Sequence, residues 1–398
     1  MRYLVWFSGG TDSVFVSWYL KQQWNEVLPV NLKNTKEKNK CCSLPTELLN
    51  ITNFLDLPLK IVDATEDFKK FVIQNFIENY SSWKTPNPCI NCNENVRFQI
   101  LDKIRQELNY DFISTGHYVK KLEVMKIVSK RSEENSEEVR RENNSQIFTY
   151  PNKSWDSVKS WYPVFYTFAI PEDKFKDQTY MLYRLLKYQN IVKHLDFPIA
   201  NFKKSEIKEI LKKNNIPINT EQESQNICFI PDDDYPRFIK QNKTINFPTW
   251  KILDINWNYL WEHKGLIYYT IWQRKGLNLN TNEKKYVVDL DWKNNILIVW
   301  DDKDLFKKEV KVIEKNILML PEQIDYSKNV LSYLKETWWI EKVYGKIRYK
   351  GKLEQVEAIE QDKVIFKNEV RAITRGQHLV LYWEKNGEIF VIWGGEIG

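Results

Sequence analysis

The sequence lacks any run of about 18 or more apolar residues, so no segment is long enough to cross a membrane as a helix. Met1-Arg2 leads directly into a short apolar stretch, so we expect no signal peptide, no membrane partner and a cytoplasmic location. Charge of one sign is also limited, because the formal net charge is only +6. With 59 lysines and arginines, the chain can accept a polyanionic partner without requiring one.

Cysteine and glycine are both scarce. The five cysteines are Cys41, Cys42, Cys89, Cys92 and Cys228. An odd number in a chain without a secretory signal favours catalytic, redox or metal-binding roles over a disulfide framework. Glycine occurs 12 times, about 3% of the chain against a usual share of roughly 7%, whereas tryptophan occurs 16 times. The two together make up about the usual share of glycine, which indicates that tryptophan replaces glycine.

A glycine-containing segment, Ser-Gly-Gly-Thr-Asp-Ser at residues 8–13, lies between an apolar run at 3–7 and a helical pattern at 14–21. Glycines let the backbone approach an anion, and the start of a helix supplies free N–H groups and a positive dipole end. The segment therefore predicts a phosphate-binding loop. The lysine-containing spacing of a Walker A loop is absent from the chain, which disfavours cleavage at the γ-phosphate.

The first half of the chain alternates short apolar runs with helical patterns, which predicts an α/β fold with a parallel sheet covered on both faces. Strands are expected at 26–32, 58–63 and 111–115, and helices at 46–55, 66–80, 93–108, 177–193 and 203–214. Residues 120–147 are strongly polar and indicate a solvated insertion. Beyond about residue 284, short alternating runs separated by turn residues predict a small all-β barrel or sandwich.

Two further segments carry candidate reactive sulfur. In residues 85–93, two prolines favour an extended approach to a helix, and Cys92 is expected near the start of that helix, where the dipole lowers a thiol pKa. Cys228 lies between apolar neighbours, where a cysteine alone is more often a packed core residue than a nucleophile. The presence of both cysteines makes a reactive pair the better interpretation.

With these segments, the chain resembles the tRNA-specific 2-thiouridylases, members of the PP-loop ATP pyrophosphatase superfamily. The motifs that carry the resemblance lie, in the order of that family, at residues 8–13, 41–42, 85–93, 97–98, 115–118, 176–180, 224–229, 263–265, 273–277, 346–349 and 376–377. The resemblance implies an adenine-nucleotide α hydrolase-like catalytic domain at 1–232 with a polar insertion at about 120–165. It further implies a small central domain at 233–283 and a C-terminal β-barrel at 284–398.

The resemblance also implies an activity, in which ATP adenylates O2 of uridine 34 in the tRNAs for Lys, Glu and Gln, and a cysteine persulfide then supplies sulfur to C2. The implied cofactors are ATP and Mg²⁺, with no metal ligand assigned to the protein, and the implied sulfur donor is a cysteine desulfurase or a sulfur relay protein. The catalytic residues would be Asp12, Cys92 and Cys228. The nucleotide contacts would be Trp6, Phe7, Ser8, Gly9, Gly10, Thr11, Asp12, Ser13, Leu32 and Gly116. The tRNA contacts would be Asn87, Pro88, Cys89, His117, Lys176, Asp177, Gln178, Arg348, Tyr349 and Gln377.

Several alternatives remain open at this level. Cys89, Cys92 and Cys228 could instead hold an iron–sulfur cluster with one open iron, whereas a structural zinc is disfavoured because the remaining cysteines are adjacent. The ATP chemistry could serve another acceptor, as in amidotransferase-type or lysidine-type relatives, although nitrogen transfer needs no second sulfur. A third alternative is a tRNA-binding protein without catalysis, in which Trp6 blocks the nucleotide.

Nine tryptophans stand where the family has glycine: Trp6, Trp24, Trp83, Trp250, Trp257, Trp261, Trp272, Trp300 and Trp393. An indole in a turn that needs positive φ, or beside a phosphate loop, introduces strain and exposed apolar surface. We therefore hypothesise that the source organism reads UGA as glycine and that these codons have been translated as tryptophan. The alternative is a tryptophan-rich lineage that uses the rings as RNA-stacking platforms.

Overall fold

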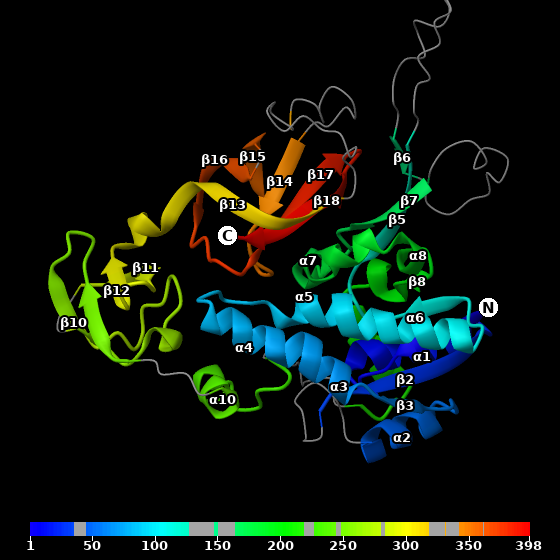
Figure 1. The fold of residues 1–398 in the computed structure, drawn as a ribbon. Coiled ribbons are helices and arrows are strands. Elements are labelled where there is room, and N and C mark those ends of the chain that lie inside the picture. The colour runs from blue at the N-terminus through cyan, green and yellow to red at the C-terminus, as the bar shows by residue number, and fades with distance from the viewer. Residues whose placement is uncertain are drawn as a thin grey trace, which may run out of the picture.

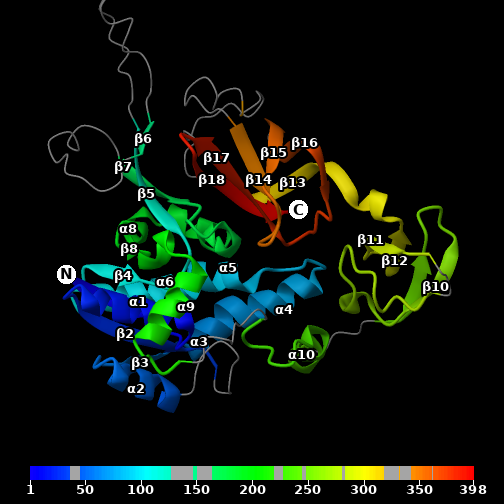
Figure 2. The same ribbon diagram turned by 180° about the vertical axis from the view of Figure 1, so that it is seen from behind.

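The computed structural model describes residues 1–35, 45–126, 147–149, 164–218, 227–243, 248–279, 283–317, 331, 342–360 and 362–398. Figures 1 and 2 show an α/β domain, a β-barrel packed beside it, and a smaller sheet set apart from both. Within the described residues, no helix is both long and apolar enough to span a bilayer.

The α/β domain is built on a five-stranded sheet in the order β3-β2-β1-β4-β8, with every pair parallel. Its strands are β1 (Arg2–Trp6), β2 (Glu26–Lys33), β3 (Lys60–Asp63), β4 (Phe112–Ser114) and β8 (Leu195–Asp196). Consecutive side chains of β1 alternate between two cores: Leu4 packs in one, and Tyr3 and Val5 pack in the other. The predicted parallel sheet with both faces covered is therefore confirmed.

Helices cover both faces of this sheet and continue beside it, toward the barrel and toward the smaller sheet (Figures 1 and 2). They are α1 (Thr11–Gln22), α2 (Pro45–Phe54), α3 (Thr65–Phe68), α4 (Gln74–Ser81), α5 (Pro88–Cys92), α6 (Phe98–Glu107), α7 (Thr179–Leu182), α8 (Gln189–Val192), α9 (Lys204–Lys213) and α10 (Tyr235–Asn242). Two π-helical turns, η1 (Lys69–Ile73) and η2 (Asn93–Arg97), join α3 to α4 and α5 to α6. Short 3₁₀ turns are η4 (Lys174–Lys176), η5 (Tyr183–Lys187) and η6 (Pro198–Asn201).

The helix expected at 93–108 begins earlier than predicted. Pro88 is its first residue, and the side chain of Asn87 caps it by accepting a hydrogen bond from the Ile90 N–H at 3.4 Å. Proline is well tolerated at this first position because its missing N–H would be unpaired there in any case. Cys89, rather than Cys92, therefore lies in the first turn, where the helix dipole acts most strongly.

The C-terminal strands close into a barrel. The strands run in the order β13 (Phe306–Ile317), β16 (Lys363–Arg371), β15 (Glu354–Ile359), β14 (Lys342–Lys346), β17 (His378–Lys385) and β18 (Glu388–Ile397), and β13 also pairs with β18. Beyond β18 the sheet continues through β7 (Val164–Ala169), β5 (Lys120–Lys126) and β6 (Ile147–Thr149). The polar insertion expected over 120–165 thus begins and ends in strands that lengthen the sheet of the barrel, and most of its centre lies outside the described residues.

The smaller sheet has the order β10-β9-β12-β11. It consists of β9 (Trp250–Leu253), β10 (Tyr259–His263), β11 (Tyr286–Asp291) and β12 (Ile296–Trp300), and the turns η7 (Leu266–Tyr268) and η8 (Asp302–Leu305) flank these strands. Ile252, Val287 and Leu297 share its separate core. Strands β11 and β12 fall within the segment that the sequence assigned to the barrel from residue 284, but β11 pairs with β12, and β12 pairs with β9.

Four of the nine tryptophans singled out above have a left-handed backbone. Their φ values are +61° at Trp24, +64° at Trp83, +65° at Trp257 and +75° at Trp272. Trp24 follows α1, and its N–H donates to Lys21 O at 3.0 Å while the next N–H donates to Leu20 O at 3.4 Å. Trp83 repeats this pattern after α4. Both patterns are Schellman motifs with tryptophan at the position that glycine usually occupies.

The other two left-handed tryptophans lie in turns. Trp257 lies in the short loop that joins β9 to β10, where its N–H donates to Asp254 O at 3.0 Å, and Trp272 is the third residue of a turn closed by the Gln273 N–H and Thr270 O at 3.0 Å. These are also positions where glycine is strongly favoured. Trp24 is 96% exposed and Trp257 61%, so little packing offsets the strain. The backbone thus supports glycine as the residue suited to these positions.

Candidate active site

The predicted phosphate loop lies at the carboxyl end of β1, in the centre of the parallel sheet. The chain passes from β1 to β2 on one side of the sheet and later returns to β4 on the other side of β1. Ligands of open α/β sheets bind outside the carboxyl ends of the strands at such a switch point. Leu32 near the end of β2 and Gly116 just after β4 flank the same edge, so the structure brings the predicted nucleotide residues together.

The start of α1 carries no side-chain cap, while the Gly10 N–H donates to the Ser8 hydroxyl at 3.3 Å. Gly9 has φ +79°, and Gly10 is the N-cap of α1 without a side chain to occupy the N–H groups of the first turn. Ser13 donates its hydroxyl to Gly10 O at 2.9 Å, and the Ser8 and Ser13 hydroxyls lie 3.2 Å apart. This geometry suits an anion such as phosphate.

Asp12 is held between two side chains that the sequence analysis did not identify as site residues. Its Oδ1 accepts a hydrogen bond from the Tyr118 hydroxyl at 2.9 Å and forms an ion pair with Lys204 Nζ at 2.7 Å. Lys204 is the first residue of α9, 192 positions after Asp12, and no local motif marks it. Only the fold brings this cation to the phosphate loop.

Gly116 is required by close contact between two loops. A Cβ at this position would lie 2.7 Å from the Cβ of Asp12 and 2.9 Å from its carbonyl carbon. Backbone atoms cannot move aside as a flexible side chain can, so any larger residue would push the loop after β4 away from the phosphate loop. This contact fixes the two halves of the predicted nucleotide site relative to each other.

His117 and Trp6 form the floor beside this loop. The Trp6 ring stacks on the His117 ring at 5.8 Å, and the guanidinium of Arg97 lies 3.6 Å from the centre of the Trp6 ring. His117 is buried, and its Nδ1 lies 2.9 Å from the Thr115 hydroxyl. Burial, with a smaller contribution from Arg97, lowers the pKa of His117 to about 3. Its imidazole is therefore neutral at physiological pH.

All four histidines have lowered pKa values, with burial as the main cause, which predicts sensitivity to acid. The unfolded chain binds these protons more readily than the folded chain. The contribution of the neutral histidines to the free energy of unfolding is therefore fully present above the ordinary histidine pKa of about 6.5, and it is lost as pH falls below that value. We expect a lower urea midpoint at about pH 5 than at about pH 7.5. His117→Asn should reduce that difference more than His194→Gln, since His194 is only partly buried. Equal midpoints at the two pH values would contradict this prediction.

The candidate sulfur residues differ in exposure. Cys89 is exposed, Cys92 is buried, and Cys228 is partly buried. Cys92 belongs to the largest core of the α/β domain, and Cys228 packs against the same core although it lies 136 positions later. The structure thus places both members of the predicted pair on one hydrophobic cluster. Cys41 and Cys42 lie outside the described residues.

The placement of the cysteines supports an iron–sulfur cluster less well than it supports a reactive pair. Across the ranges that the structure describes, no three histidine, cysteine, aspartate or glutamate side chains are grouped closely enough to hold a metal ion. Cys89, Cys92 and Cys228 as placed therefore do not fit the ligand set of an iron–sulfur cluster, and we derive no step through such a cluster.

Several of the predicted tRNA residues lie where the barrel meets the α/β domain, whereas His117 is buried beside the phosphate loop. Gln377 donates to Thr85 O at 2.8 Å, directly before Asn87 and Pro88. Asp177 is buried and forms an ion pair with Lys346 of β14 at 2.9 Å, close in sequence to Arg348 and Tyr349. Gln178 accepts a hydrogen bond from the Tyr118 N–H at 2.9 Å, and Lys176 lies beside it in η4. Asp177 and Gln377 thus bind the two domains together, while their direct contact with tRNA stays a prediction.

Comparison with known proteins agrees with this architecture. Three family models match in sequence order: the tRNA methyl transferase HUP domain at 1–150 and 158–232, the tRNA methyl transferase PRC-barrel domain at 237–301, and the aminomethyltransferase beta-barrel domain at 329–396. A solved U34-tRNA thiolase, NcsA from Methanococcus maripaludis with its [4Fe-4S] cluster, covers 61% of this chain and 66% of its own at 15% identity. Its TM-score of 0.30 is too low to carry an argument.

Two curated relatives match over almost their whole length. The tRNA-specific 2-thiouridylase MnmA 1 of Caldanaerobacter subterraneus subsp. tengcongensis is 34% identical over 413 residues, covering 100% of this chain and 97% of the relative. The tRNA-specific 2-thiouridylase MnmA of Clostridioides difficile is 30% identical over 408 residues, covering 100% and 98%. The chain therefore belongs to the tRNA-specific 2-thiouridylase family and is a tRNA-uridine 2-sulfurtransferase.

Proposed function

We propose that this enzyme thiolates uridine 34 of the tRNAs for Lys, Glu and Gln in two steps, adenylation followed by sulfur transfer. The observation that carries the proposal is the position of Asp12, Lys204 and the uncapped start of α1 at one switch point of the sheet. ATP would bind there, with its phosphates on the N–H groups of residues 8–13. Bound Mg²⁺ would neutralise phosphate charge, and the Asp12 carboxylate is an oxygen ligand of the type that Mg²⁺ prefers.

In the first step, the uridine O2 attacks the α-phosphorus of ATP, and the bond to pyrophosphate breaks. The uridine then carries AMP on O2, which makes C2 electrophilic and O2 part of a good leaving group. Lys204 would lie close enough to the departing pyrophosphate to stabilise its growing charge. Neutral His117 would hold its place in the floor of the site without adding charge.

In the second step, Cys228 carries a persulfide received from a donor such as a cysteine desulfurase or a sulfur relay protein. The Cys92 thiolate attacks the sulfur of Cys228, the persulfide S–S bond breaks, and the released sulfide attacks C2 as AMP leaves. Cys92 and Cys228 end as a disulfide, which a thiol reductant must open before the next turnover. Their packing on one cluster supports this pairing.

The base must leave the anticodon stack to reach this site. Asn87, Pro88 and Cys89 would contact it at the start of α5. Arg348 would bind the RNA backbone. Burial, and then the charge of Arg371, lower the pKa of its guanidinium. Tyr349, beside it, offers a ring for base stacking.

Replacement of Asp12 tests the adenylation step. We expect Asp12→Ala to abolish ATP-dependent pyrophosphate release, since the carboxylate that positions Lys204 and the metal is lost. Asp56→Ala, which removes an almost fully exposed carboxylate that pairs with Lys21, is the matched control and should release pyrophosphate normally. Pyrophosphate release by Asp12→Ala at the rate of the control would show that the nucleotide does not react at this loop.

A further inference from the structure

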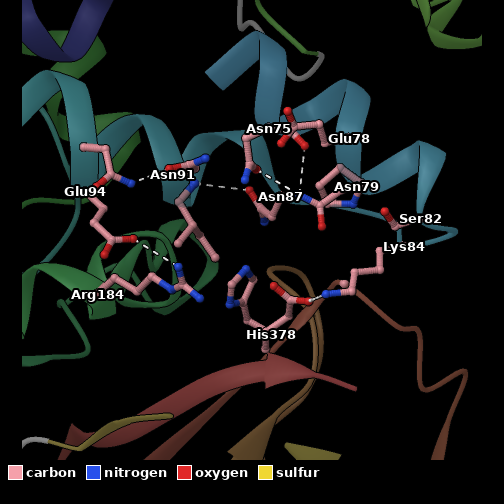
Figure 3. A pocket seen from close by; sticks show the side chains of 15 residues that line it. Asn75, Glu78, Asn79, Ser82, Lys84, Asn87, Asn91, Glu94, Arg184 and His378 are labelled. Carbon is pink, nitrogen blue, oxygen red and sulfur yellow. Dashed lines mark hydrogen bonds and ion pairs between the residues drawn. The ribbon is translucent and has the colours of Figure 1, made fainter. Parts of the chain in front are cut away.

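A polar pocket of about 370 Å³ lies between the α/β domain and the barrel, apart from the phosphate loop. Its walls come from α4, α5, η2 and η5 on one side and from the barrel on the other (Figure 3). The polar side chains that line it include Asn75, Glu78, Asn79, Lys84, Asn87, Asn91, Glu94, Asn95, Arg184, His378 and Glu396. The pocket is large enough to admit a group the size of a nucleoside.

The pocket lies on the face of α5 opposite the candidate reactive cysteines. Ile90, Asn91 and Glu94 line it, and their spacing of one, three and four residues places them on one side of the helix. Asn87, which caps the helix, lines the pocket as well as the proposed site of the target uridine. Cys89 and Cys92 project from the other side. Since a helix with side chains is roughly 10–12 Å across, the two sites are about one helix width apart, which neighbouring nucleotides of one RNA strand can span.

The charges that line the pocket are mostly paired with one another. Glu94 is buried and contacts both Arg184, at 3.2 Å, and Lys187. Lys84 and Glu396 form a second ion pair at 2.7 Å. Among the charged residues that line the pocket, only Glu78 remains outside these pairs, so the pocket offers no spare cation. This arrangement disfavours a phosphate or a carboxylate and favours a neutral polar ligand.

The remaining polar groups can recognise such a ligand by hydrogen bonds. Asn79 donates to Asn75 and Asn95 donates to Asn91, and within the described residues no hydrogen bond reaches Oδ1 of Asn79 or Asn95. His378 points into the pocket in Figure 3, and its Nδ1 lies 2.8 Å from the Tyr183 hydroxyl. Burial, and then Arg184, lower the pKa of His378, so its ring is a neutral partner.

We propose that this pocket binds a second nucleobase of the tRNA, one next to the uridine that is thiolated. The inference rests on the proposed function, because the target uridine must enter the site on the other face of α5. A base is neutral, carries donors and acceptors on its edge, and can be splayed out of a single-stranded loop. The amides and His378 would read its edge, and Glu78 could accept from one of its N–H groups.

The test uses anticodon stem–loop RNAs in which each nucleotide flanking the target uridine is replaced in turn by an abasic site. Asn75→Phe adds bulk to the pocket at an exposed helix position, and Gln74→Phe, the neighbouring exposed residue outside the pocket lining, is its matched control. We expect one flanking abasic site to weaken binding to the wild type and to Gln74→Phe about tenfold. Asn75→Phe should bind the intact RNA about tenfold more weakly, and the same abasic site should cause no further loss.

The opposite results would overturn the inference. They are equal RNA affinities of Asn75→Phe and Gln74→Phe, or an abasic penalty that is unchanged in Asn75→Phe. Binding of a free nucleoside at this pocket without any effect of a flanking abasic site would also overturn it. Failure of the proposed function is seen separately, as absence of pyrophosphate release by the wild type with intact RNA.

Discussion

Serine in place of Cys92 or Cys228 is expected to abolish thiolation of tRNA while leaving pyrophosphate release largely intact. Adenylation needs the phosphate loop and not the thiols, whereas sulfur transfer needs a persulfide on Cys228 and a thiolate at Cys92 to release it. Mass spectrometry of the tRNA for added sulfur, run beside a pyrophosphate assay, measures the two steps separately. Each single variant should lose at least two orders of magnitude in thiolation, since the pair acts as a unit.

Cys41→Ser is the control for this experiment and should thiolate almost normally, because the proposed chemistry gives that residue no role. Substantial sulfur incorporation by either Cys92→Ser or Cys228→Ser would refute the two-cysteine mechanism. If a variant loses both pyrophosphate release and thiolation, it fails before sulfur transfer. The cysteines would then serve the fold or the binding of RNA.

Glycine at Trp24, Trp83, Trp257 and Trp272 together is expected to make the protein markedly more stable. Each of these residues has positive φ, which costs an L-amino acid with a side chain about 1 kcal/mol or more and costs glycine almost nothing. Trp83 also stacks on Trp292 at 4.3 Å, so its replacement should stabilise least. The thermal midpoint of the quadruple variant, compared with the parent chain, measures the effect.

Trp18→Gly is the opposite control, because Trp18 lies inside α1, where glycine weakens a helix by about 1 kcal/mol. It should lower the thermal midpoint. If UGA is glycine in the source organism, all nine tryptophan codons singled out in the sequence are UGA, and the protein purified from that organism carries glycine there. UGG codons at Trp24 and Trp272, with no gain in stability from glycine, would show that the tryptophans are genuine.

Most of the secondary structure could be predicted because its signals are local. The strands expected at 26–32, 58–63 and 111–115 correspond to β2, β3 and β4, and the phosphate loop falls between β1 and α1 as its glycines indicate. The sequence does not reveal the start of α5, because the prolines of 85–93 favour an extended segment, although proline is also favoured at the first position of a helix.

The sequence by itself determined the alternating α/β pattern, the phosphate loop, the candidate cysteines and the shortage of glycine, since each depends on residues close together in the chain. Only the tertiary structure decided which distant groups meet. Lys204 reaches Asp12 across 192 positions, β7 joins β18 to extend the barrel, and the pocket behind α5 takes its wall from the barrel. Such contacts depend on how strands pair and domains pack, and local propensity contains no information about that choice.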